Sequence, residues 1–334
     1  MKIGIVGLPN VGKSSLFNLL TKANAQVAKF PFTTIDRNVG MVFIPDERLV
    51  KIVEIAKSTK MRFASIEFTD IAGLIKGAHK GEGLGNKFLS HIRDVDLVIH
   101  LLRCFEDPDI PHTDSNIVPK RDYDIVRTEL FLSDLEVVER NMEKIKKKAE
   151  CREEFERLNR IKDSLSQGKI PEETIHDLPL LSTKTEIVVL NVDEDGKFKN
   201  GIEGFRLSIK LEEDILEFKE GEKQDLRRDA GLNPQGLAGL LELCLKKLSM
   251  ILFYTMKGEE ARAWPIKKGT KTLDAAGMIH TDLKDGFIKA EVLSYNDFMK
   301  AGGFAQAQHL GFTKIEGKDY LVQDGDILLI KFRG

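Results

Sequence analysis

Short apolar runs separated by amphipathic segments dominate the first hundred residues and return at 186–191. Unbroken apolar runs of this length are typical of strands buried on both faces of a parallel sheet. After the first run, residues 15–22 place Leu16, Leu19 and Leu20 on one face of a helix. The pattern predicts an α/β fold with a mostly parallel sheet.

Residues 120–166 follow a different pattern, because mostly apolar side chains recur at steps of three and four between dense charges. These positions are Thr128, Phe131, Leu135, Val138, Met142 and Ile145, then Phe155, Leu158, Ile161 and Leu165. The spacing predicts two long helices paired as an antiparallel coiled-coil hairpin. No Gly or Pro marks the turn. Such an arm favours contact with a partner, the alternative being packing against the body.

Residues 250–334 predict a small mixed β domain, with strands around a helix at 272–279. No catalytic constellation is present there, which favours a docking module. The predicted organisation is therefore one nucleotide-binding domain at 1–120 and 180–249, a coiled-coil insertion at 121–179, and the C-terminal domain at 250–334.

Composition narrows the classes of function. In 334 residues, 51 Lys and Arg stand against 53 Asp and Glu, so no global charge predicts binding to DNA or to an anionic membrane. The three cysteines form no CxxC pair, which indicates a reducing compartment without a disulfide framework or zinc site. No apolar run is long enough for a signal peptide or a membrane helix, so we expect a cytoplasmic protein.

The motif G-x-x-x-x-G-K-[ST] spans residues 7–14, between the first predicted strand and helix. This is the phosphate-binding loop, whose backbone N–H groups and helix N-terminus bind phosphate. Lys13 would bridge the β- and γ-phosphates as a catalytic group, and Ser14 would bind Mg2+ through its hydroxyl. The candidate nucleotide-binding residues of the loop are Asn10, Val11, Gly12, Lys13, Ser14 and Ser15.

Later residues complete a magnesium and γ-phosphate site. Asp70 ends a predicted strand in the sequence D-x-x-G, which makes Asp70 a candidate Mg2+ ligand and the Gly73 N–H a candidate γ-phosphate contact. Thr33 and Thr34 lie in a turn-prone segment after the first helix, and Thr34 is the preferred metal ligand of the two.

The residue after Gly73 is Leu74, which cannot orient water as the glutamine of many GTPases does. His79 and His100 are candidates for that role. The simpler interpretation of His100 is that it packs inside an apolar strand.

Residues 191–194 follow a strand at the position where guanine-specific proteins have N-K-x-D. Glu194 replaces the aspartate, and a carboxylate one methylene longer cannot take the same bidentate position on guanine. The residues therefore argue against strong guanine selection and allow ATP. The candidate base-site residues are Asn191, Val192, Glu194 and, in a later strand-and-loop, Ser208.

Together these motifs resemble the YchF or Obg-like ATPase family of P-loop NTPases, and the resemblance covers nearly the whole chain. The segments that carry it are 7–14, 30–34, 70–74, 81–89, 103–106, 191–194, 262–264, 275–282, 286–291 and 316–320. The resemblance implies a G-domain with a coiled-coil insertion and a ubiquitin-like β-grasp domain, called TGS. One departure is Ile209, which is bulkier than the residue that the family has beside the base.

The resemblance also implies a function: a Mg2+-dependent ATPase, with weaker activity on GTP, that associates with the large ribosomal subunit and its rRNA in translation or stress regulation. It implies that His100 is catalytic and that Asn10 is a candidate K+ ligand. Two alternatives stay open, an Obg-type GTPase in ribosome assembly and a nucleotide-sensing binding module with negligible turnover.

Overall fold

The computed structural model describes residues 1–27, 39–71, 84–111, 116–146, 151–173, 175, 178–198 and 201–333, with backbone only at 23–27 and 84–88. The chain divides into two compact units. Unit 1 comprises Met1–Val42 and Glu67–Leu240, and unit 2 comprises Phe43–Ile66 and Leu241–Gly334. None of the described helices is long and apolar enough to cross a membrane.

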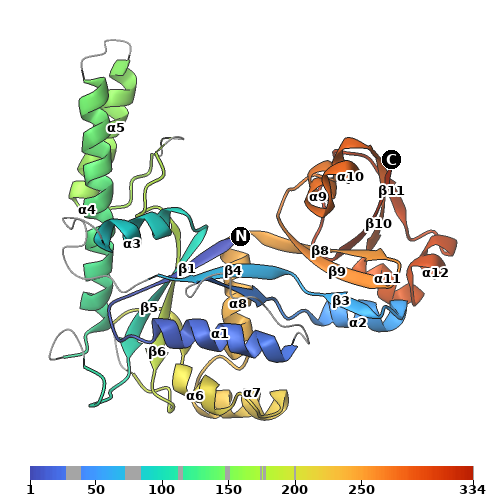
Figure 1. Cartoon of the computed structure of the whole chain (residues 1–334), viewed down its shortest axis with the longest axis horizontal. Coiled ribbons are helices and arrows are strands. Elements are labelled where there is room, and N and C mark those ends of the chain that lie inside the picture. The colour runs from blue at the N-terminus through green and yellow to red at the C-terminus, as the bar shows by residue number, and fades with distance from the viewer. Residues whose placement is uncertain are drawn as a thin grey trace. The chain divides into compact units, whose positions relative to one another are not determined.

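Unit 1 is built on the predicted parallel sheet (Figure 1). Its spatial order is β2 (Val39–Phe43), β4 (Ser65–Asp70), β1 (Lys2–Val6), β5 (Leu97–Cys104), β6 (Thr185–Val192) and β7 (Phe205–Leu207). The last five run parallel to their neighbours. All eight residues of β5 are buried, which explains why all but His100 and Arg103 are apolar. β1 lies between β4 and β5 in this sheet. The loop after β1 therefore lies at the carboxyl end of these parallel strands, where ligands bind in such folds.

The first helices of unit 1 connect these strands, and the last three follow β7. These helices are α1 (Lys13–Val27), α3 (Leu84–Arg93), α4 (Pro119–Ile145), α5 (Arg152–Ser166), α6 (Ile209–Asp214), α7 (Glu220–Asp229) and α8 (Gly236–Lys247), the last continuing into unit 2.

The predicted hairpin is formed by α4 and α5, which lie side by side (Figure 1). Its seam consists of Val138, Met142, Leu158, Ile161, Leu165 and Leu180, with Phe131, Leu135, Ile145 and Phe155 packed against them. All of these except Leu180 lie at the positions that the spacing predicts. α4 ends at Ile145 and α5 begins at Arg152, and residues 147–150 between them lie outside the described residues.

Unit 2 has the predicted β-grasp arrangement. Its sheet has the order β11 (Lys314–Glu316), β10 (Phe287–Ser294), β12 (Asp326–Phe332), β8 (Met250–Lys257), β9 (Glu260–Lys267) and β3 (Lys60–Arg62). The β8–β9 hairpin is antiparallel, and β12 pairs with β8 in parallel. The helices are α2 (Glu47–Ala56), α9 (Thr272–Ile279), α10 (Thr281–Asp285), α11 (Tyr295–Ala301) and α12 (Phe304–His309).

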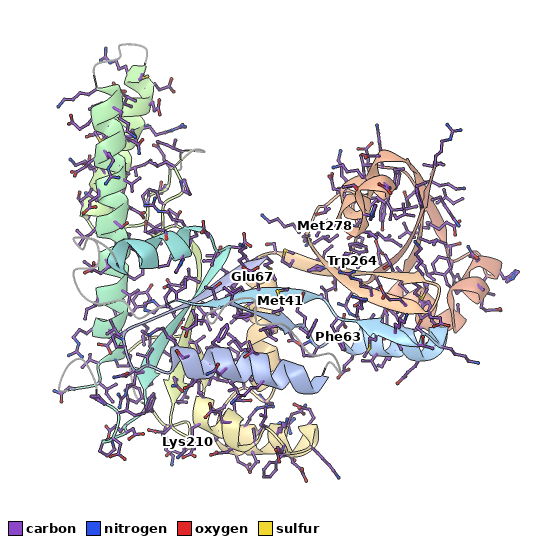
Figure 2. The ribbon with its side chains drawn as sticks, in the orientation of Figure 1. Met41, Phe63, Glu67, Lys210, Trp264 and Met278 are labelled. Carbon is purple, nitrogen blue, oxygen red and sulfur yellow. The ribbon has the colours of Figure 1, made fainter. Side chains whose placement is uncertain are left out.

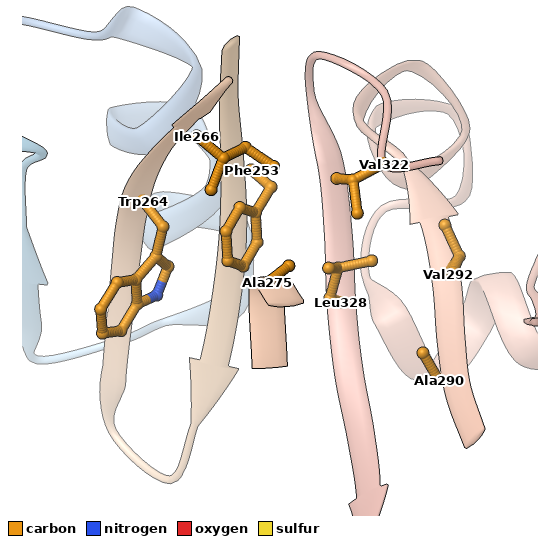
Figure 3. Close-up of a cluster of buried hydrophobic side chains, with 8 residues drawn as sticks. All are labelled: Phe253, Trp264, Ile266, Ala275, Ala290, Val292, Val322 and Leu328. Atoms are coloured by element: carbon orange, nitrogen blue, oxygen red, sulfur yellow. The ribbon is translucent and has the colours of Figure 1, made fainter. Parts of the chain in front are cut away.

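The core of unit 2 lies between its sheet and α9. Figure 3 shows its members, which are Phe253, Trp264, Ile266, Ala275, Ala290, Val292, Val322 and Leu328. The small side chain of Ala275 lets α9 approach the strands closely, because it is fully buried and has only a methyl group to accommodate.

Residues 43–66 belong to unit 2, whereas the sequence interpretation placed them in the nucleotide-binding domain. Long-range contacts explain the difference. β3 pairs with β9 in parallel, Lys60 opposite Glu260. Arg48, in the first turn of α2, donates a hydrogen bond of 2.7 Å to Asp324. The segment therefore joins the second sheet through pairings that cannot be read from its own residues.

Candidate functional site

The phosphate loop adopts the curled conformation that its glycines predict. Gly7 and Gly12 have φ values of 155° and 101°, and Asn10 lies in the left-handed region at 61°. A Cβ atom on Gly7 would lie 2.4 Å from the Leu101 carbonyl oxygen, and one on Gly12 would lie 2.8 Å from Asn191 Nδ2. A larger residue at position 7 would have to move the backbone of β5, and one at position 12 would have to move the Asn191 side chain.

Lys13 begins α1, and its side chain turns back across the loop. The residue is buried, and Nζ donates a hydrogen bond of 2.8 Å to the Leu8 carbonyl. Burial lowers the pKa of Lys13 to about 8, although the nearby Asp70 carboxylate favours the charged form. A bound phosphate group would place further negative charge beside Lys13 and so stabilise the charged form of its ammonium group.

Ser14 and Asp70 meet at the carboxyl end of the sheet. Ser14 Oγ donates a 2.6 Å hydrogen bond to Asp70 Oδ2, while Asp70 Oδ1 is buried without a partner among the described residues. A hydroxyl and a carboxylate are the hard oxygen ligands that Mg2+ takes beside phosphate oxygens and water. The pair therefore fits a magnesium ion. Thr34 and Gly73, the other residues predicted for this site, lie outside the described residues, as do Leu74 and His79.

Asn191 joins the phosphate loop to the segment after β7. Its Nδ2 donates to the Val11 carbonyl at 3.0 Å, and its Oδ1 accepts from the Ile209 N–H at 3.2 Å. Ser208 is buried and caps α6 by accepting a hydrogen bond from Leu211 N. The structure thus brings Val11, Asn191 and Ser208 together, as the sequence predicts.

Two other predicted base-site residues lie differently. Val192 is buried in a cluster with Leu102 and Cys104, so its side chain belongs to the core. Glu194 is near the surface, where it forms an ion pair of 3.1 Å with Lys210, which is labelled in Figure 2. Because a lysine already engages Glu194, this carboxylate is partly neutralised before any base binds.

Asn10 and Ser15 are exposed members of the loop. Asn10 Nδ2 donates a 2.9 Å hydrogen bond to the Pro111 carbonyl, a contact that sequence reasoning did not anticipate. This contact occupies the amide nitrogen and leaves Oδ1 to serve as an acceptor or a cation ligand.

His100 does not lie with this group. Ile5 pairs with both Asp70 and Ile99. Residues paired across parallel strands point to the same face, and successive residues alternate, so His100 points to the face opposite Asp70.

The contacts of His100 agree with that placement. Its fully buried ring stacks on Tyr123 of α4, with a centroid distance of 5.0 Å, and Nδ1 lies 2.8 Å from Glu186 Oε1. Burial alone would raise the pKa of Glu186, but the hydrogen bond and charge of His100, together with Arg127, lower it overall. The geometry gives His100 a place in the packing of α4, and its predicted catalytic role receives no support from the described residues.

Comparison with known proteins places these features in a family. A family model described as a 50S ribosome-binding GTPase matches residues 2–148, and the YchF-GTPase_C model, described as a protein of unknown function, matches residues 250–333. The chain is 40% identical over 359 aligned positions to the ribosome-binding ATPase YchF of Bacillus subtilis, covering 98% of each chain. It is 38% identical to the protein of that name from Escherichia coli O157:H7, covering 99% of each.

Comparison with solved structures also finds similar proteins. The YchF GTPase of Schizosaccharomyces pombe matches with a TM-score of 0.85 at 31% identity, covering 99% of this chain and 97% of that one. A GTP-binding protein from Pyrococcus horikoshii, at 18% identity and a TM-score of 0.60, shares the fold. The full-length identity, the two family models and the phosphate-site geometry together show that this chain belongs to the YchF family of P-loop nucleotide hydrolases.

Proposed function

We propose that this protein is a ribosome-associated ATPase, in which binding and hydrolysis of ATP with Mg2+ switch its contact with the large ribosomal subunit and its rRNA. The observation that carries the proposal is the convergence of Lys13, Ser14 and Asp70 on one curled loop. The ribosome-binding ATPases of Bacillus subtilis and Escherichia coli are similar along the whole chain, which supports both the ribosome and the choice of ATP.

The residues have distinct roles in this proposal. The backbone N–H groups of the loop and the start of α1 bind the phosphates, and Lys13 exchanges the Leu8 carbonyl for the β- and γ-phosphates. Ser14 and Asp70 exchange their mutual hydrogen bond for the magnesium ion, with Thr34 as a further ligand. The ion, when bound, neutralises charge on the phosphate oxygens. Gly73 is proposed to contact the γ-phosphate and to release it after hydrolysis.

ATP is preferred in this proposal because Glu194 takes the position of the guanine-binding aspartate, and Lys210 engages it. The alternative is an Obg-type GTPase. Competition of ATP and GTP for one fluorescent nucleotide separates the two, and tighter binding of GTP favours the alternative.

A monovalent cation is a second proposed cofactor. The Pro111 carbonyl accepts the Asn10 amide N–H, so Asn10 presents an oxygen, the ligand type that K+ takes. ATP hydrolysis measured in K+ and in Na+ at equal ionic strength tests this, with stimulation by K+ expected and equal rates contradicting it.

The main experiment measures steady-state ATP hydrolysis with and without ribosomes, for the native protein and for Lys13→Ala. Lys51→Ala is a matched control, because Lys51 is exposed on α2 in unit 2. We expect ribosomes to stimulate a slow intrinsic rate, Lys13→Ala to abolish it, and the control to keep it. Unchanged turnover in Lys13→Ala would refute the site. Ribosome binding without measurable hydrolysis would favour a nucleotide-sensing module.

A further inference from the structure

Arg103 is a buried cation at the carboxyl end of β5, with 2% of its surface exposed. Its guanidinium donates to three backbone carbonyls, those of Phe105 at 3.2 Å, Asp107 at 3.1 Å and Ile110 at 3.0 Å. It also lies over the Phe105 ring, 4.5 Å from the centroid. No carboxylate of the described chain forms an ion pair with it. All of its described hydrogen bonds therefore hold one segment, residues 105–110.

The far end of that segment reaches the phosphate loop. The carbonyl of Pro111, directly after Ile110, accepts the 2.9 Å hydrogen bond from Asn10 Nδ2. Near its start, the Glu106 N–H approaches Asp193 Oδ2 at 3.4 Å. Arg103 thus fixes the segment 105–111 along its length, and the Pro111 carbonyl at its end accepts a hydrogen bond from the phosphate loop.

Arg103 has a counterpart on the adjacent strand. It pairs in register with Asn191, whose side chain holds the carbonyl of Val11. Side chains on two neighbouring strands therefore fix neighbouring residues of the phosphate loop. Asn191 holds Val11 directly, and Arg103 holds Asn10 through the 105–111 segment. This parallel distinguishes Arg103 from a residue that only fills the core.

We propose that Arg103 is a positioning residue for ATP hydrolysis, which orients the Asn10 side chain through the 105–111 segment. The inference rests on the proposed ATPase function. Arginine suits the task because its planar fork donates in three fixed directions, whereas the ammonium group of lysine cannot reach three separate carbonyls in one plane. With the segment fixed, the Asn10 amide has one orientation, and its oxygen faces away from Pro111. Loss of that orientation would affect turnover more than the binding of ATP, which many backbone N–H groups share.

The test compares Arg103→Lys, Pro111→Gly and Asn10→Ala. The first loses the three-way hydrogen bonding, the second loosens the segment at an exposed residue, and the third removes the side chain that is positioned. Arg127→Lys is the matched control: Arg127 is also a buried arginine bonded to a carbonyl, that of Ser182, but it lies on α4 and has no contact with the phosphate loop.

Because misplacing a reacting group by about 1 Å can cost up to about 100-fold in rate, we expect Arg103→Lys to lower kcat about tenfold or more. The Kd of a fluorescent ATP analogue should change less than about threefold, which a general loss of folding would not produce. Arg103→Lys combined with Asn10→Ala should be no slower than the slower single variant, because both act through one contact. Arg127→Lys should lose thermal stability and keep kcat.

Several outcomes would overturn the proposal. A folded Arg103→Lys variant with native kcat would do so, as would losses in the double variant that multiply. If Arg103→Lys does not fold, Pro111→Gly decides, and native kcat in that variant rejects the proposal. If the native protein itself failed to hydrolyse ATP, the proposed function would fail first, so the two failures are distinguishable.

Discussion

Replacing Asn191 with alanine tests how far the phosphate loop depends on a single buried side chain. The substitution removes the hydrogen bonds to the Val11 carbonyl and from the Ile209 N–H, and both of those residues are buried. A buried group left without its partner costs about 1–3 kcal/mol, so two such groups should lower the free energy of unfolding of unit 1 by about 2–6 kcal/mol. The phosphate loop, freed at Val11, should also bind ATP more weakly.

Urea unfolding followed by circular dichroism measures the first effect, and titration with a fluorescent ATP analogue measures the second. Asn191→Asp separates the two bonds, because it keeps an acceptor for Ile209 N–H and loses the donor to Val11. We expect the aspartate variant to weaken ATP binding as much as alanine does, since it also places a carboxylate against a carbonyl. A loss below about 0.5 kcal/mol in Asn191→Ala, the range of an ordinary surface substitution, would refute the reasoning.

Three further predictions concern titration, packing and thiol reactivity. Because the pKa of Lys13 in the free protein is about 8 and phosphate favours its charged form, ATP binding should take up about half a proton at pH 8, and affinity at pH 9 should be about tenfold weaker than at pH 7; a flat profile in calorimetry would contradict this. His100→Ala should cost about 2–4 kcal/mol in urea unfolding, since it leaves a cavity and removes one hydrogen bond from the partly buried Glu186 carboxylate, whereas a folded variant with strongly reduced kcat would restore the catalytic interpretation. In native protein a thiol reagent should modify Cys151 rapidly and spare Cys104 and Cys244, which are buried; burial raises the pKa of Cys244 to about 12, and rapid reaction of all three would show that the interior opens.

The parts of the fold that the sequence predicts are those set by local patterns. The strand at the N-terminus, the phosphate loop and the helix at 272–279 depend on residues close together in the chain, and the structure confirms all three. The coiled-coil seam follows from spacing in the same way. The location of residues 43–66 cannot be predicted from a local pattern. β3 has only three residues, none of them β-branched, and it is defined by its pairing with the distant β9.

The candidate site shows the same division. Ser14 and Asp70 are predicted from their motifs and lie within hydrogen-bonding distance. His100 is chosen for its residue type, but the alternation of side chains along β5 turns it to the opposite face from Asp70. Arg103 lies in the segment 103–106 that carries the family resemblance, but its role does not follow from the motif, since its three described hydrogen bonds go to backbone carbonyls that any residue provides.

The chain crosses between the units next to residues 42, 66 and 240, and β4 begins in unit 2 and ends at Asp70 in unit 1. A gene shortened after residue 249 would therefore not yield a self-contained nucleotide hydrolase. It would retain α2 and β3 while discarding β9 and Asp324, leaving backbone groups of β3 without their partners and the Arg48 guanidinium with Asp46 but without Asp324. Evolution could exchange the carboxyl-terminal domain of such a molecule only by replacing this internal segment at the same time, so the two parts of the chain must be inherited together.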